Sequence, residues 1–185
     1  PSAEAVLITK NDLRIEAQAA PGEVVLQGTG PTDQRVGFRL LNTSGVLLQG
    51  FTVLQFRIGI VVETGSANTV RKNVTTQNQI VGIEVFNSNA NVVEQNISSL
   101  NAGIRFPGGV FVAGPQATGN IIRHNQTSGN RIGIHLNGTG PDNVVFGNET
   151  FDNRLAGFSL LRSGQAETGG TGNVVSGNNS YRNPD

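Results

Sequence analysis

A six-residue motif, Asn-[Thr/Val/Ile]-[Val/Ile]-x-x-Asn, occurs five times in the sequence. Its copies begin at Asn68, Asn91, Asn120, Asn143 and Asn173. The intervals are 23, 29, 23 and 30 residues, which is a period of 23 with insertions of 6 and 7 residues. A period between about 20 and 50 residues indicates stacked units, because one unit cannot bury its apolar face alone. The sequence therefore predicts a solenoid.

Each repeat contains three short segments with the alternation of side chains that is typical of strands. The first segment lies inside the Asn motif, where Val70 is expected to point inward. The second carries a small hydroxyl residue, which we also expect to face inward. The third has the pattern Gly-[Ile/Val/Phe]-x-[Val/Leu], as in residues 82–85. The hydroxyl column consists of Thr75, Ser98, Thr127, Thr150 and Ser180.

Asparagine recurs at the three turns between these segments, in columns that include Asn68, Asn73 and Asn78. Strands of successive coils are about 4.8 Å apart, so identical residues in register can form hydrogen-bonded ladders. The same stacking lets the hydroxyl column satisfy its own hydrogen bonds. We expect about seven coils in one domain over residues 1–185. The coils are irregular at 7–44 and regular at about 45–183.

These repeats resemble the right-handed parallel β-helix repeats of the pectin-lyase-like superfamily. The similarity is to carbohydrate-binding and sugar-hydrolase β-helix proteins and to NosD-like periplasmic proteins, and it covers residues 13–183. It implies an all-β, right-handed parallel β-helix. Members usually begin with an amphipathic capping helix, which is not visible before Leu7, and the last coil stops at Asn183 before its Gly-Ile strand. We therefore expect the chain to be part of a longer protein.

Composition excludes several classes of partner. Thirteen basic and thirteen acidic residues cancel, so no net field attracts nucleic acid. No apolar run approaches the ~20 residues that a membrane span needs. The absence of cysteine excludes disulfides and thiolate metal sites. A secreted, cell-surface or periplasmic location is expected, and a solenoid of this kind is compatible with end-to-end or trimeric self-association.

The resemblance places function on the outer face of the sheet formed by the Gly-Ile-x-Val strands. The residues expected to point outward there are Val61, Glu84, Phe111, His135 and Ser159. Arginines line one shoulder, and the insertion at 102–108 brings one more arginine and a phenylalanine to the same face. The guanidinium groups could pair bidentately with uronate carboxylates, and the rings could stack on sugars. The candidate carbohydrate-binding residues are Arg57, Arg105, Phe106, Phe111, Arg131 and Arg154. The alternative is that these are ordinary exposed residues of a scaffold.

Catalysis has weaker support, with Glu84 and His135 as the candidate residues. They lie two coils apart, about 9.6 Å, which is too far for a direct hydrogen bond. Paired glycosidase carboxylates and a calcium-binding acidic cluster are both missing from the outward columns, as is the Asp-Pro-His motif typical of alginate-type epimerases. We therefore predict no cofactor and no metal site, with calcium as an alternative that the sequence does not support. Two separated histidines without Cys or Met do not support copper ligation either.

The sequence thus favours an extracellular or cell-surface β-helix module that binds or presents a polysaccharide and is not catalytic on its own. One alternative is a polysaccharide lyase or C5-epimerase acting on uronate polymers. Another is a structural rod in an adhesin, a spore surface or a phage tail.

Overall fold

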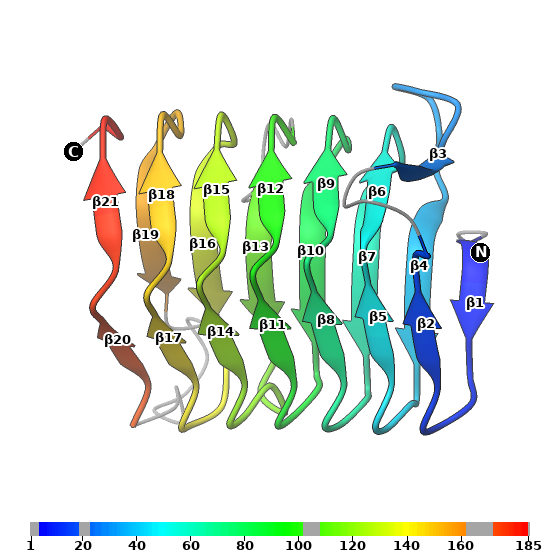
Figure 1. Cartoon of the computed structure of the whole chain (residues 1–185). Helices are drawn as coiled ribbons and strands as arrows, with labels where there is room; N and C mark the ends of the chain where they lie inside the picture. Colours follow the sequence, from blue (N-terminus) through cyan, green and yellow to red (C-terminus); the bar gives the residue numbers. More distant parts are fainter. Residues whose placement is uncertain (1–3, 19–22, 102–107, 162–171, 185) are drawn as a thin grey trace.

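The computed structural model describes residues 4–18, 23–101, 108–161 and 172–184. These residues form 21 strands and no helix, and every strand pair is parallel. The strands make three sheets of seven strands each, so the predicted parallel β-helix of about seven coils is confirmed. Figure 1 shows the coils stacked side by side in chain order.

Each coil contributes one strand to each sheet. Sheet A contains β1 (Glu4–Ile8), β4 (Val36–Leu41), β7 (Ile58–Glu63), β10 (Val81–Phe86), β13 (Gly108–Ala113), β16 (Ile132–Asn137) and β19 (Ala156–Leu161). Sheet B contains β2 (Arg14–Glu16), β5 (Leu47–Gln49), β8 (Thr69–Arg71), β11 (Val92–Glu94), β14 (Ile121–Arg123), β17 (Val144–Phe146) and β20 (Val174–Ser176). Sheet C contains β3 (Val24–Gln27), β6 (Phe51–Leu54), β9 (Val74–Thr76), β12 (Ile97–Ser99), β15 (Gln126–Ser128), β18 (Glu149–Phe151) and β21 (Asn179–Tyr181).

The core lies inside the coil and is built from aliphatic columns in register. Sheet A supplies two such columns, represented by Ile83 and Val85, and sheet B supplies the column that contains Val70. All three of these side chains are almost completely buried. Removing apolar surface from water in this way stabilises the coil by about 25 cal/mol per Å².

The hydroxyl column of sheet C faces inward, as the sequence predicted. Thr75 Oγ1 donates a hydrogen bond to Ser98 Oγ at 2.9 Å, and Ser98 Oγ donates to the Gly109 carbonyl at 3.1 Å. Thr127 differs, because its buried Oγ1 has no hydrogen-bond partner among the described residues. The expectation that the hydroxyl column satisfies itself is therefore wrong at this position.

Three asparagine ladders run along the turns, and their side chains are buried in the middle of the stack. In each ladder an asparagine donates from its backbone N–H and from Nδ2 to the Oδ1 of the next coil. For Asn68 and Asn91 the distances are 2.9 and 3.1 Å. Nδ2 of Asn68 also donates to the Thr43 carbonyl at 2.9 Å. The ladders thus satisfy turn groups that no sheet can pair.

The residue before each ladder asparagine takes a left-handed conformation in all fifteen regular turns. Ala67, Lys72 and Gln77 have φ values of 52°, 53° and 55°. Glycine occupies the same place in five of the turns, for example Gly119 with a φ of 61°. A single left-handed residue turns the chain sharply, so each coil has three corners.

The glycine of the Gly-[Ile/Val/Phe]-x-[Val/Leu] pattern has a different role. A Cβ on Gly82 would lie 2.2 Å from Ser98 Oγ and 2.5 Å from Thr75 Oγ1. The glycine column therefore leaves room for the inward hydroxyl column, and its recurrence reflects close packing.

Candidate functional site

The outer face of sheet A carries one column of side chains in the predicted register. Arg39, Val61, Glu84, Phe111, His135 and Ser159 are successive partners in this column. Arg39 extends the column beyond the residues expected from the repeat, because it lies in the irregular N-terminal coils. Val61 and His135 belong to this column but are each only 5% exposed.

Glu84 is the acid of this column. It is half-buried, and loss of hydration raises the pKa of its carboxyl to about 7. The negative charge of Glu63 adds to this increase in pKa, and the positive charge of Arg57 opposes it. Glu84 can therefore hold or release a proton near neutral pH, which suits a general acid or base.

Glu63 forms an ion pair with Arg39. Nε and Nη2 of Arg39 donate to Glu63 Oε2 at 2.9 and 2.6 Å, and Nη1 donates to Glu4 Oε1 at 2.8 Å. Arg39 lies in the same outward column as Glu84, while Glu63 is paired with Phe86, two residues further along the strand. These residues form a charged network beside Glu84.

His135 is stacked against Phe111. Their ring centroids are 5.4 Å apart and the planes differ by 12°. Nδ1 of His135 lies 3.2 Å from the Ser159 carbonyl oxygen. A carbonyl only accepts, so Nδ1 carries the proton in this contact and Nε2 is left as an acceptor in the neutral ring. Burial, together with the charge of Arg131, lowers the pKa of His135 and favours that neutral form.

Glu84 and His135 are not in contact, because Phe111 lies between them in the register. Phe111 therefore has one face occupied by His135, and the sequence prediction of a free ring for stacking on sugar holds at most for its other face. Two titratable groups therefore share one face of sheet A, with an aromatic ring separating them.

Arginines form a shoulder beside this face. The Arg57 N–H donates a hydrogen bond to the Arg35 carbonyl of the preceding coil. In the same way the Leu155 N–H donates to the Arg131 carbonyl. Arg154 is displaced from this register by one residue, since its N–H donates to the Asn130 carbonyl. Arg57 and Arg131 are half-buried and Arg154 is exposed. Arg105 and Phe106, which the sequence analysis placed on this face, lie outside the described residues.

The shoulder arginines differ from the other described arginines in their pairing. Six arginines have a carboxylate partner: Arg14, Arg35, Arg39, Arg71, Arg123 and Arg182. Arg71 and Arg123 both pair with Glu94 across neighbouring strands of sheet B. Within the described ranges Arg57, Arg131 and Arg154 make no ion pair. Three guanidinium groups on this shoulder are therefore available to an anion.

The described residues contain no group of three or more His, Cys, Asp or Glu side chains arranged to hold a metal ion. His124 lies in the turn between sheets B and C, next to Phe146, whereas His135 is on sheet A. The described part of the chain also has no helical segment with the length and apolarity of a membrane span.

Comparison with known proteins identifies relatives of this architecture. The model of the family described as periplasmic copper-binding protein (NosD) matches residues 4–179. The crystal structure of an alginate lyase from Paenibacillus sp. str. FPU-7 has a TM-score of 0.65 and 14% identity, covering 95% of this chain and 83% of that one. No curated protein matches the sequence.

Crystal structures of the periplasmic alginate epimerase AlgG are also similar. One has a TM-score of 0.61 and 14% identity over 82% of this chain and 42% of the epimerase. A point mutant of the same enzyme gives 0.66 and 13% identity over 96% and 47%. The chain thus spans less than half the length of these epimerases. At such identities the similarity shows the fold alone.

Proposed function

The chain belongs to the NosD family, and we propose that it is a periplasmic β-helix module that binds a uronate-containing polysaccharide on the outer face of sheet A. The observation that carries this proposal is the set of three shoulder arginines that have no carboxylate partner in the part of the chain that the structure describes. The alginate-acting enzymes with the same fold support a uronate polymer as the ligand. The family description and the name of the epimerase support a periplasmic location.

Guanidinium groups recognise carboxylates bidentately, so a polymer that carries one carboxylate per sugar suits a row of arginines. Arg131 and Arg154 belong to adjacent coils, about 4.8 Å apart, and Arg57 lies three coils from Arg131, about 14 Å. A chain running along the solenoid axis would meet all three. The exposed part of Phe111 would supply apolar contact beside them.

The copper named in the family description does not fit these residues. The sequence has no Cys or Met, and its two histidines lie on different sides of the coil. Neither histidine belongs to a group of three metal-binding side chains among the described residues. Soft sulfur ligands or clustered imidazoles are the groups that bind copper well. We therefore assign no copper chemistry to this part of the protein.

Calorimetric titration with alginate oligosaccharides at low ionic strength tests the binding proposal. We expect binding that weakens as salt is added, because the ion pairs are partly exposed. Arg131→Gln or Arg154→Gln should weaken binding about tenfold, since a hydrogen bond to a charged group contributes about 1.5 to 3 kcal/mol. Arg123→Gln is the matched control on sheet B and should leave affinity unchanged. Equal losses in all three variants would contradict the assignment of this face.

A second function, uronate lyase or C5-epimerase activity, is favoured by the acid–base groups on the same face. A base removes the C5 proton of a uronate unit while a shoulder arginine neutralises its carboxylate. The electron pair then either expels the C4 substituent, giving a C4–C5 double bond, or takes a proton on the opposite face. Glu84 and the unprotonated Nε2 of His135 could exchange these protons.

Two assays separate this activity from binding alone. The ultraviolet absorbance of the unsaturated product reports elimination, and incorporation of deuterium at C5 in heavy water reports epimerisation. If the site is catalytic, Glu84→Gln and His135→Ala should abolish either signal, and Glu94→Gln on sheet B should not. Absence of both signals with uronate polymers would leave binding as the function of this face.

A further inference from the structure

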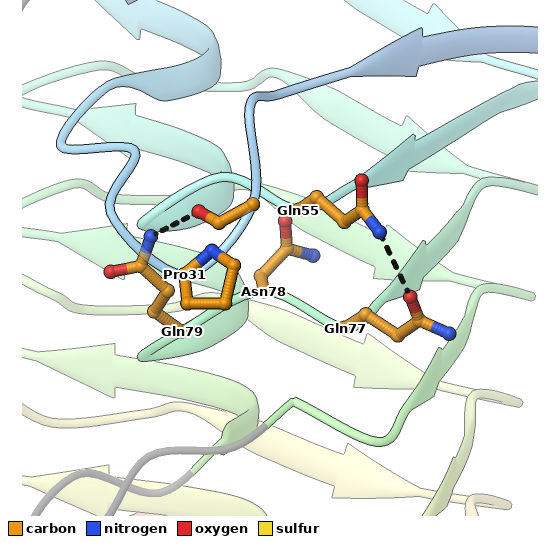
Figure 2. A pocket seen from close by; sticks show the side chains of 6 residues that line it. Pro31, Gln55, Gln77, Asn78 and Gln79 are labelled. Carbon is orange, nitrogen blue, oxygen red and sulfur yellow. Dashed lines mark hydrogen bonds between the residues drawn. The ribbon is translucent and has the colours of Figure 1, made fainter.

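A pocket of about 320 Å³ lies where the chain passes from sheet C to sheet A, and we propose that it binds a neutral saccharide or polyol. It is lined by Gly30, Pro31, Gln55, Gln77, Asn78 and Gln79. The lining residues come from three successive coils, as Figure 2 shows. This proposal does not depend on the uronate-binding face, because the two sites share no residue.

The pocket wall is held in place by hydrogen bonds from the loop between β3 and β4. Nε2 of Gln79 donates to the carbonyl oxygens of Gly30 at 2.9 Å and Asp33 at 2.6 Å. The Gly30 N–H donates to the Gln55 carbonyl at 3.2 Å. The loop is therefore fixed before any ligand arrives, which reduces the entropy lost on binding.

Asp33 stabilises the same loop from within. Its carboxylate accepts hydrogen bonds from the Thr29 N–H at 2.7 Å and from the Arg35 side chain at 2.8 and 3.0 Å. These contacts hold the pKa of Asp33 far below its ordinary value. The charge of Asp33 is thus paired with Arg35, and Asp33 supplies only its backbone carbonyl to Gln79.

Glutamine amides supply the polar groups of the pocket. Nε2 of Gln27 donates to Gln55 Oε1 at 2.7 Å, and Nε2 of Gln55 donates to Gln77 Oε1 at 3.4 Å. Nε2 of Gln77 has no acceptor among the described residues, so it is available to a ligand. An amide presents both donors and an acceptor, as a sugar hydroxyl does, and the two groups can therefore pair in either sense.

The size and the charge of the pocket narrow the choice of ligand. None of the six lining side chains is ionisable, so nothing compensates the desolvation of a carboxylate or phosphate. The volume is at the lower end of the range of about 300 to 1,000 Å³ for small-molecule sites, which suits a single sugar unit. The Pro31 ring provides an apolar wall for the C–H face of such a ring. Asn78 takes part in the asparagine ladder and is assigned no contact with the ligand.

Saturation-transfer NMR with glucose, mannose, galactose, N-acetylglucosamine and inositol, each at millimolar concentration, tests the proposal. Glucuronate serves as the charged comparison. We expect at least one neutral compound to bind more tightly than glucuronate. Gln77→Met keeps the length of the side chain but removes the amide, and it should weaken that binding about tenfold, which corresponds to about 1.4 kcal/mol.

Gln95→Met is the matched control. Gln95 occupies the same left-handed turn position before a ladder asparagine, with a φ of 55°, and it is exposed like Gln77. The Gln95→Met variant should bind the neutral compound as the unaltered protein does. The Arg131→Gln variant should do the same. The proposal is overturned if no neutral compound binds, if glucuronate binds best, or if Gln77→Met and Gln95→Met behave alike.

Discussion

Asn125 Oδ1 accepts two hydrogen bonds from Asn96, one from its backbone N–H and one from its Nδ2, both at 3.0 Å. Nδ2 of Asn125 in turn donates to the Val93 carbonyl at 2.8 Å and to Asn148 Oδ1 at 3.0 Å. A single side chain therefore links three coils. All of these groups are buried, so none can pair with water if Asn125 is replaced.

We expect Asn125→Leu to lower the free energy of unfolding by about 2 to 4 kcal/mol, because each buried polar group left unpaired costs about 1 to 3 kcal/mol. Denaturant titration measures this loss. Asn89→Leu is the control, since Asn89 is exposed and outside the ladders, and it should change the stability by less than about 0.5 kcal/mol. Equal effects of the two substitutions would show that the ladder contributes no more than surface asparagines do.

The hydrogen bonding of the hydroxyl column leads to opposite predictions for two of its threonines. Thr127→Val should be neutral or stabilising, since the buried Oγ1 of Thr127 has no partner to lose. Thr75→Val should cost about 1 to 2 kcal/mol, because it removes the donor to Ser98 Oγ. Thermal unfolding of the two variants in parallel provides the measurement. A loss for Thr127→Val as large as that for Thr75→Val would contradict this account of the column.

Alanine substitutions at two glycines distinguish the cost of disturbed packing from the cost of backbone strain. Gly82→Ala should destabilise the protein by about 3 kcal/mol or more, since its Cβ would overlap buried hydroxyls. Gly119→Ala should cost less, about 1 to 2 kcal/mol, which is the strain of a left-handed residue at its φ of 61°. Its Cβ meets nothing within 4 Å, and Ala67 and Ala90 already occupy the same turn position with φ values of 52°. Comparison of the two denaturation midpoints checks this order.

The raised pKa of Glu84 predicts that the folded protein becomes less stable as pH rises. Its carboxyl has a pKa of about 7 in the folded protein and 4.5 as the ordinary value, so between these values the folded state binds more protons than the unfolded state. The contribution of Glu84 to the free energy of unfolding is therefore largest below pH 4.5, and it is lost as pH rises through 7. The loss should be roughly 1 to 3 kcal/mol after allowance for partial exposure.

Carbon-13 NMR of the Glu84 carboxyl should show a midpoint near 7. Glu84→Gln should remove the corresponding part of the pH dependence of unfolding, and Glu63→Gln should move the midpoint downward because it removes a neighbouring negative charge. The lowered pKa of His135 acts in the opposite direction, so the difference between the unaltered protein and Glu84→Gln is the relevant quantity. A midpoint at the ordinary value of 4.5 would sink the prediction.

The regular coils could be predicted from the sequence because their period carries the register. Once Asn68, Asn91 and Asn120 are aligned, the positions of Glu84, Phe111 and His135 in one column follow, and the structure confirms this column. Alignment cannot give burial, however, since it depends on neighbours outside the repeat. The stacking of His135 on Phe111 and the loss of its exposure were therefore not predicted.

Contacts made by the irregular coils could not be predicted from the repeat. Arg39 joins Glu4 to Glu63 across sequence separations of 35 and 24 residues, and no Asn motif precedes it to fix its register. The pocket was missed for the same reason. Gln79 contacts Gly30 and Asp33 across 49 and 46 residues, through the loop that joins β3 to β4.

The asparagine ladders also give the stack a direction. In every ladder the backbone N–H of an asparagine donates to the Oδ1 of the next coil, so the Oδ1 atoms point back toward the previous coil. Nδ2 donates in both directions, to the Oδ1 of the next coil and to a backbone carbonyl of the previous one, as in Asn125. Aligned amides of this kind polarise one another. Two such stacks can consequently be fused head to tail, for example by duplicating a coil of 23 residues, but a reversed coil would break the N–H to Oδ1 hydrogen bonds at all three corners.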